Sequence, residues 1–257
     1  MTVLRIFSIA HQTLTEARRN KIFYSIFLFA LVVILNSYLF TEVTITTLDR
    51  VLKDTGVAAI SVFALALTIF TGIGVINREI DKKNIFPIIA KPIARYEFIV
   101  GKFLGLLAMM VSTCGLMFVC LLLALVSYRT PITPSLWLGA LGVFLEVCVL
   151  GAFALLCSTF TNSFASAFMT FALFISGHLS AELYRFALKS SSDFVHYMGQ
   201  GLFYVVPNLE RFNFKYNVTY DVPVAGNILA MTVGYAGLYT AVFLVAAVLV
   251  FSRRDFR

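Results

Sequence analysis

Residues 77–103 have the sequence NREIDKKNIFPIIAKPIARYEFIVGKF, and this long polar interruption organises an otherwise apolar chain. Its centre, residues 85–89, is apolar and has basic side chains on both flanks. Asn84 is a favoured helix N-cap, and Pro92 discourages a helix from continuing past Lys91. We predict a surface helix of about two turns. Its apolar side chains have to be covered by a partner protein or by the membrane surface.

The composition of the chain excludes a soluble globular domain. Of its 257 residues, 60% are hydrophobic and 13% are charged. In an average soluble domain, about 25% of the residues are charged. Several apolar runs reach the roughly 20 residues that a helix needs to cross a bilayer. We therefore predict an all-α polytopic membrane protein, with residues 1–257 forming a single transmembrane domain.

The net charge and the cysteines argue against two other classes of protein. The charge is +7, but the basic residues cluster beside the apolar runs on one side, as membrane topology requires. We therefore expect no nucleic-acid partner. The four cysteines lie inside apolar runs and form no Cys-x-x-Cys pair, so neither a disulfide framework nor a zinc site is predicted.

The apolar runs predict six membrane spans, at 22–40, 57–76, 98–126, 136–160, 164–183 and 224–251. Before the first span, residues 1–21 predict an amphipathic helix that lies in the membrane interface, the alternative being a frayed tail. Between the fifth and sixth spans, residues 184–223 mix polar and aromatic side chains. This mixture predicts short extracytoplasmic helices, or a re-entrant course.

The distribution of lysine and arginine predicts the orientation. Most of them lie in the N-terminus, in residues 78–102 and in the C-terminus. By the positive-inside rule, both termini and the 77–97 loop are cytoplasmic. The third span opens with Gly101-x-x-x-Gly105, a spacing that lets another helix approach closely. A chance pair of glycines is the other interpretation.

Several segments together resemble a known family of membrane proteins. They are Arg78-Glu79, residues 90–95 (AKPIAR), Gly101-Lys102, and residues 207–212 (PNLERF) before the last span. With the six-span layout, they resemble the permease subunit of an ABC-2-type transporter. The most similar branch contains the permeases for multicopper-enzyme and nitrous-oxide-reductase maturation and for gliding motility.

The resemblance implies that the loop between spans 2 and 3 is a coupling helix, which docks into a groove on a separate cytoplasmic ABC ATPase. Its apolar centre would fill the groove and its charged rim would fix the register. The 161–163 turn would be a lesser coupling point. The docking residues would be Arg78, Glu79, Lys82, Lys83, Ile85, Phe86, Ile88, Ile89, Lys91 and Arg95.

The resemblance also implies the partners and the location. The sequence contains no G-x-x-x-x-G-K-[ST] motif, so ATP and Mg are expected on the partner ATPase, with no cofactor and no catalytic residue in this chain. A second permease copy or a sister permease would complete the pathway. The expected location is the bacterial inner membrane. One alternative is a mechanical or assembly role on an extracytoplasmic protein, without solute transport.

Polar residues inside the spans suggest further chemistry. Glu146 is the acidic residue deep inside a span, and a charge there has to face the bundle interior, a cavity or a partner. It indicates either a translocation path, including that of an ion-coupled secondary transporter, or a hydrogen-bonded helix contact. His178 and Glu182, one turn apart, could pair with each other or bind a metal, and the alternative is a simple polar contact at the interface. The face formed by Met110, Cys114 and Met117 could pass a soft metal or could simply fill the core.

Overall fold

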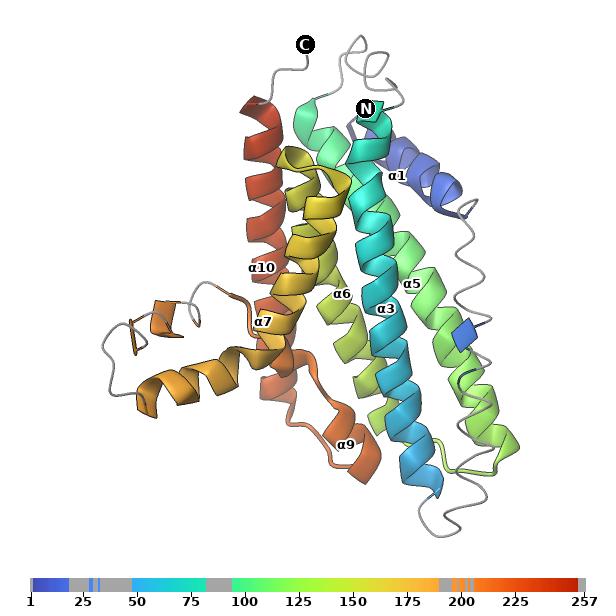
Figure 1. The fold of residues 1–257 in the computed structure, drawn as a ribbon. Helices are drawn as coiled ribbons and strands as arrows, with labels where there is room; N and C mark the ends of the chain where they lie inside the picture. The colour runs from blue at the N-terminus through green and yellow to red at the C-terminus, as the bar shows by residue number, and fades with distance from the viewer. Residues whose placement is uncertain are drawn as a thin grey trace.

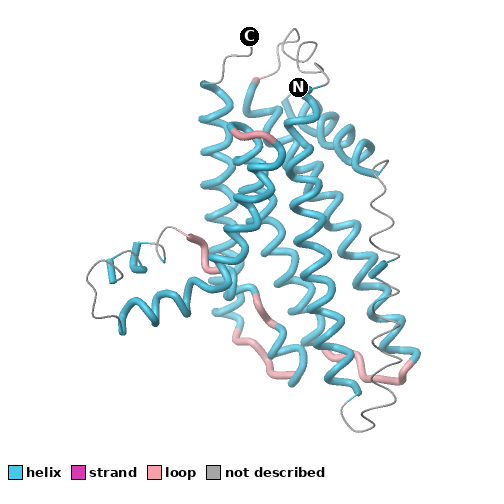
Figure 2. Tube along the Cα trace, in the orientation of Figure 1, coloured by secondary structure: helices cyan, strands magenta, loops and turns pink. Residues whose placement is uncertain are grey.

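The computed structural model describes residues 2–18, 28, 29, 32, 48–81, 94–189, 196, 197, 199–201, 203 and 206–253. Every element of regular secondary structure in this part of the chain is a helix (Figures 1 and 2). The α-helices are α1 (Thr2–Arg18), α3 (Leu48–Asp81), α5 (Arg95–Ser127), α6 (Ser135–Phe160), α7 (Ser163–Lys189), α9 (Lys215–Tyr220) and α10 (Gly226–Arg253). The 3₁₀ helix η1 covers Leu209–Phe212.

Five of these helices, α3, α5, α6, α7 and α10, are long and apolar enough to cross a membrane. They confirm five of the predicted spans as helices, whereas the predicted span at 22–40 lies almost wholly outside the described residues. Helix α3 is longer than predicted at both ends and begins at Leu48 instead of residue 57. Its polar first turns are stable as a helix because Leu52 and Lys53 are buried against neighbouring elements.

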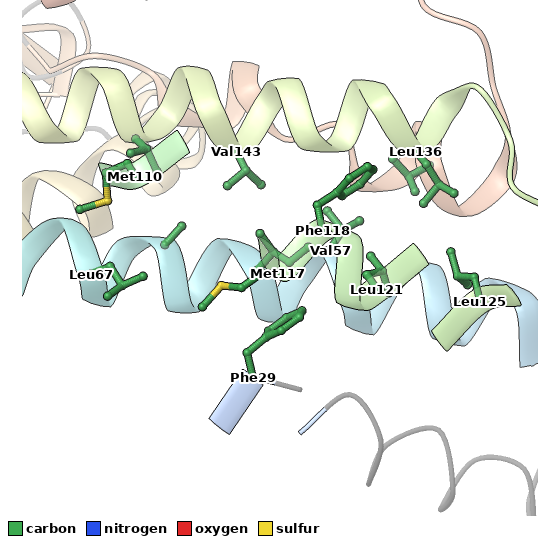
Figure 3. Close-up of a cluster of buried hydrophobic side chains, with 14 of the residues drawn as sticks. Phe29, Val57, Leu67, Met110, Met117, Phe118, Leu121, Leu125, Leu136 and Val143 are labelled. Atoms are coloured by element: carbon green, nitrogen blue, oxygen red, sulfur yellow. The ribbon is translucent and has the colours of Figure 1, made fainter. Parts of the chain in front are cut away.

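Helix α6 lies at the centre of the bundle and contacts α3, α5, α7 and α10. Residues 145–152 of α6 are all buried, which fits a helix that is apolar all round. The largest core cluster packs α3, α5 and α6 together through side chains such as Val57, Met117, Leu121 and Val143 (Figure 3). The order of the contacts shows that α3 runs antiparallel to α5 and parallel to α6.

The two ends of the bundle carry different elements. At one end, the Arg95 Nη1 atom donates to the carbonyl oxygens of Phe251 (2.9 Å) and Ser252 (2.7 Å). The Phe98 and Phe251 rings stack there, with centroids 5.6 Å apart. We call this the Arg95 end, and it holds the start of α5, the end of α10 and the turn between α6 and α7. The opposite, Lys53 end holds the starts of α3 and α6.

Helix α1 packs on α5 through the Gly101-x-x-x-Gly105 pair. A β-carbon at Gly101 would lie 2.9 Å from Ile9 Cβ, and one at Gly105 would lie 2.5 Å from Thr13 Cβ. These glycines therefore are a surface of close helix approach, and the chance-pair interpretation is wrong. Helix α1, expected in the membrane interface, lies inclined across α5 near the Arg95 end (Figure 1).

We predict that Gly105→Leu loosens the contact between α1 and α5, because the new side chain overlaps Thr13 and the Ala10 carbonyl oxygen. Overpacking of this kind costs about 1–3 kcal/mol. Thermal unfolding of the purified protein should show a midpoint lower by on the order of 5 °C. The matched control is Gly115→Leu, on the same helix, where a β-carbon meets nothing within 4 Å. Equal losses in both variants would contradict the proposed role of this contact.

Candidate functional site

Residues 207–214, which we call the returning segment, fold back against the bundle and pack on two glycines. A β-carbon at Gly177 of α7 would lie 2.6 Å from Leu209 Cγ and 2.9 Å from the Pro207 carbonyl oxygen. A β-carbon at Gly142 of α6 would collide with the carbonyl oxygen of Phe212. Leu209 and Phe212 are almost completely buried. The two glycines thus let this backbone approach α6 and α7 more closely than a larger residue would allow.

Local hydrogen bonds give the segment its shape. The Asn208 side chain caps η1 by accepting from the Glu210 backbone N–H (3.0 Å). The Asn208 backbone N–H donates to the Tyr235 hydroxyl of α10 (2.8 Å). The guanidinium of Arg211 lies 4.8 Å from the centre of the Tyr235 ring. The segment is therefore attached to α10 as well as to α6 and α7.

Three ionisable side chains meet where the segment touches the bundle. His178 Nε2 lies 2.9 Å from Glu146 Oε1, and His178 Nδ1 lies 3.0 Å from Glu210 Oε2. We call Glu146, His178 and Glu210 the triad. Its side chains are 10%, 26% and 49% exposed in that order, so it leads from the interior of the bundle to its surface. The second oxygen of Glu210, Oε1, accepts from Asn213 Nδ2 (2.7 Å).

A small cavity of about 60 Å³ adjoins the triad. Such a volume holds a few water molecules. Its polar lining comes from Ser61, Asn213 and Lys215, together with Glu146 and His178. The apolar lining consists mainly of valine and phenylalanine side chains from α3, α6, α7 and the returning segment. The arrangement can solvate an ionisable cluster and can exchange protons with water.

The structure shows which of the polar residues singled out in the spans contact one another. Glu146 faces the bundle interior, as a charged group inside a span should. His178 does not pair with Glu182, which the sequence left open, because both ring nitrogens of His178 contact the other two triad members. Glu182 instead accepts from Arg185 (2.9 Å) on the exposed side of α7. Glu210 was missed: it lies in the PNLERF motif, but its contact joins residues 32 positions apart.

The Met110, Cys114 and Met117 face is core packing. Met110 and Met117 are almost completely buried in the core cluster of Figure 3, and Cys114 packs against that cluster. The Met110 sulfur accepts a hydrogen bond from Thr68 Oγ1 (3.6 Å). Within the described part of the chain, no group of three or more His, Cys, Asp or Glu side chains could hold a metal ion. The triad carboxylates bind opposite sides of one imidazole ring and do not converge on a common point.

The structure describes three of the predicted ATPase-docking residues, and they lie on two different helices. Arg78 and Glu79 belong to the last turns of α3. Arg95 begins α5, and its guanidinium donates to the last carbonyl oxygens of α10. Arg95 thus joins two membrane helices directly after the loop. The remaining docking residues, Lys82, Lys83, Ile85, Phe86, Ile88, Ile89 and Lys91, lie outside the described residues.

A second polar cluster joins three segments at the Lys53 end. Lys53 is 1% exposed, and its Nζ donates to Thr133 Oγ1 (3.2 Å) and Asp221 Oδ2 (3.2 Å). The Ser135 hydroxyl donates to Asp221 Oδ1 (2.5 Å). Partial burial alone would raise the pKa of Asp221. The hydrogen bonds from Ser135, Thr133 and Lys53 and the lysine charge outweigh that effect and lower the pKa below its ordinary value of 3.8.

The fold and these sites define a multi-pass helical membrane protein with polar clusters inside its bundle. A family model described as "ABC-2 family transporter protein" matches residues 7–256. The chain therefore belongs to the ABC-2 transporter family, as a permease subunit without catalytic activity of its own. Membership implies an ATPase partner and a membrane. No individual curated protein matches the chain.

We predict that Asp221 contributes to stability in a pH-dependent way. Because its pKa is lowered in the folded protein, the contribution is present above the unfolded value of about 3.8. It is lost as the pH falls through the lower, folded value. Asp221→Asn should therefore lower the thermal midpoint near neutral pH, and its deficit should shrink as the pH falls below about 4. A deficit that stays constant at every pH would contradict this prediction. The matched control is Asp54→Asn, at the same end of the bundle.

Proposed function

We propose that this permease subunit receives force from its ATPase through residues 77–97. The observation that carries the proposal is the joining of helices at the Arg95 end. There α3 ends, α5 begins, and Arg95 links α5 to the last turn of α10. Helix α1 packs on the same part of α5. A displacement of the loop would therefore act on α1, α3, α5 and α10 together.

The same segment offers the chemistry that a docking helix needs. Ile85, Phe86, Ile88 and Ile89 would fill a groove on the ATPase. The charged residues around them would fix the register, as in the resemblance described above. The 161–163 turn lies at the same end of the bundle and would be a second contact point. ATP and Mg would be bound by the ATPase and not by this chain.

We also propose six spans, with 22–40 as the first. Helix α1 packs near the Arg95 end, whereas α3 begins at the opposite end, so the intervening chain has to connect the two ends. Phe29 supports this course, because it is buried and its ring lies 5.8 Å from that of Phe63 in α3. The positive-inside rule then puts both termini and the 77–97 loop in the cytoplasm of a bacterial cell, with 184–223 outside the inner membrane.

A second permease copy or a sister permease is proposed as the membrane partner. Helices α7 and α10 present large apolar side chains outward, among them Phe164, Phe168 and Met231. Either lipid or another permease can cover them.

The likeness to the multicopper-enzyme, nitrous-oxide-reductase and gliding-motility branch rests on the sequence motifs. We further propose that Glu146 lies on the translocation path of this permease.

One observation favours a mechanical function as the second candidate. The last turns of α7 leave the bundle and extend to one side (Figure 1). Phe186 on these turns is 68% exposed, and Leu183 and Leu188 are exposed too. Such a projection could carry ATPase-driven motion to an extracytoplasmic protein without moving a solute. Mutations there would then disturb that protein and leave ATPase binding unchanged.

We predict that replacing Ile85, Phe86 and Ile89 by Asp abolishes copurification of the ABC ATPase with the tagged permease. The new carboxylates would have to be buried without partners in the docking groove, which costs roughly several kcal/mol for each group. Mass spectrometry of the purified complex would measure the ATPase. The control is Ile132→Asp, at an exposed position near the opposite end. If the unaltered permease never retains an ABC ATPase, or if the triple variant still does, the docking proposal is wrong.

A further inference from the structure

The two hydrogen bonds of the triad need more protons than a neutral imidazole supplies. A neutral imidazole has one N–H donor and one acceptor nitrogen, and an ionised carboxylate can only accept. His178 contacts a carboxylate through each ring nitrogen, at 2.9 and 3.0 Å. With neutral His178 and both glutamates ionised, one contact would bring two acceptors together. Two protons therefore have to be shared among the three groups, as an imidazolium or as a protonated glutamic acid.

The surroundings of the triad act on its second proton in two opposite directions. With it, the triad carries one net negative charge, and without it two. Charge inside a membrane protein is costly unless it is paired. Lys215 lines the same cavity, while Arg211 lies over the ring of Tyr235 on α10. The facing part of α3 contributes the uncharged Ser61. Within the described residues, the positive charge near the triad comes from the returning segment and α9, and this charge favours loss of the second proton, whereas the cost of two unpaired negative charges favours keeping it.

We propose that the triad is a proton-binding site that holds residues 207–214 against α6 and α7. With its second proton bound, both hydrogen bonds form and the segment is held on Gly142 and Gly177. When the proton leaves through the half-exposed Glu210, the contact between His178 and Glu210 becomes repulsive and the segment is released. This function lies beyond ATPase coupling and does not depend on where the ATPase docks.

The geometry provides a variant that separates the proton from the contact. Glu210 Oε1 accepts from Asn213, and Oε2 contacts His178 Nδ1. In Glu210→Gln, the amide oxygen can take the first position and the amide NH₂ the second. The NH₂ group then donates to a neutral His178, whose Nε2–H donates to Glu146. Both contacts form without an exchangeable second proton. Glu210→Ala removes the outer contact altogether.

Hydrogen exchange of the full-length protein in lipid nanodiscs tests the proposal. The backbone amides of residues 208–214 are measured by mass spectrometry at about pH 6 and about pH 9, and corrected for the intrinsic pH dependence of exchange. In the unaltered protein, their corrected exchange should rise about tenfold or more at the higher pH, as expected when a hydrogen bond to a charged group is lost. Glu210→Gln should stay slow at both pH values, and Glu210→Ala should be fast at both.

The matched control is Glu182→Gln, whose carboxylate pairs with Arg185 on the same helix. It should follow the unaltered protein at both pH values. Unchanged exchange in the unaltered protein, or a Glu210→Gln variant that still responds to pH, would overturn the proposal. These two proteins suffice if Glu210→Ala fails to fold. Because the chain has three histidines, ¹⁵N-histidine NMR provides an independent readout. The His178 ring signals should change with pH in the unaltered protein and stay those of neutral imidazole in Glu210→Gln.

Discussion

A carboxylate in the middle of α6 has to find its partners inside the protein, since lipid offers none. Glu146 meets this constraint through His178 of α7, which in turn contacts Glu210 of the returning segment. One unfavourable position on the central helix thus determines which face α7 presents and where the chain before α10 has to return. This buried pairing stabilises the fold only if every polar atom of the three side chains has a hydrogen-bond partner. This explains why the segment around Glu210 is itself held by Asn208, Asn213 and Tyr235.

Close approach at glycines makes this pairing possible. Gly142 and Gly177 remove the side chains that would keep the backbone of residues 207–212 away from α6 and α7. Gly101 and Gly105 do the same for α1 on α5. In a membrane, the hydrophobic effect does not drive helices together, so short interhelical distances and hydrogen bonds take its place. The glycines and the triad are therefore two parts of one solution to packing in lipid.

Helix α5 connects the Arg95 end of the permease to the core cluster that contains α6. Its first turn binds the end of α10 through Arg95 and the start of α1 through Glu97, whose carboxylate lies 3.9 Å from Arg5. Further along, it packs in the same core cluster as α3 and α6, the helix that carries Glu146. A rigid-body movement of α5 would therefore displace the end of α10, the start of α1 and the core that contains α6. Such a connection suits a subunit whose work is supplied by another protein.

The order and length of the apolar runs determined most of the secondary structure. Runs near 20 residues form helices in lipid regardless of their neighbours, because every backbone group is then satisfied internally. For this reason the helices at 98–126, 136–160 and 224–251 appear close to where the sequence predicts them. Glu146 was recognisable too, since an acid amid apolar residues needs a partner. The glycine pair at 101 and 105 indicated close approach but not which helix approaches.

Tertiary structure alone decided the partners. His178 and Glu182 are one turn apart and could have paired. Instead α6 and the returning segment bring Glu146 and Glu210 to the two sides of His178. No local pattern encodes a contact across 32 residues, because it depends on how deeply Gly142 and Gly177 let a backbone approach. Arg95 gives the same lesson. Its charge predicted part of a docking rim, which stays a prediction, and the sequence did not indicate its bonds to the last carbonyl oxygens of α10, because only packing brings that end within reach.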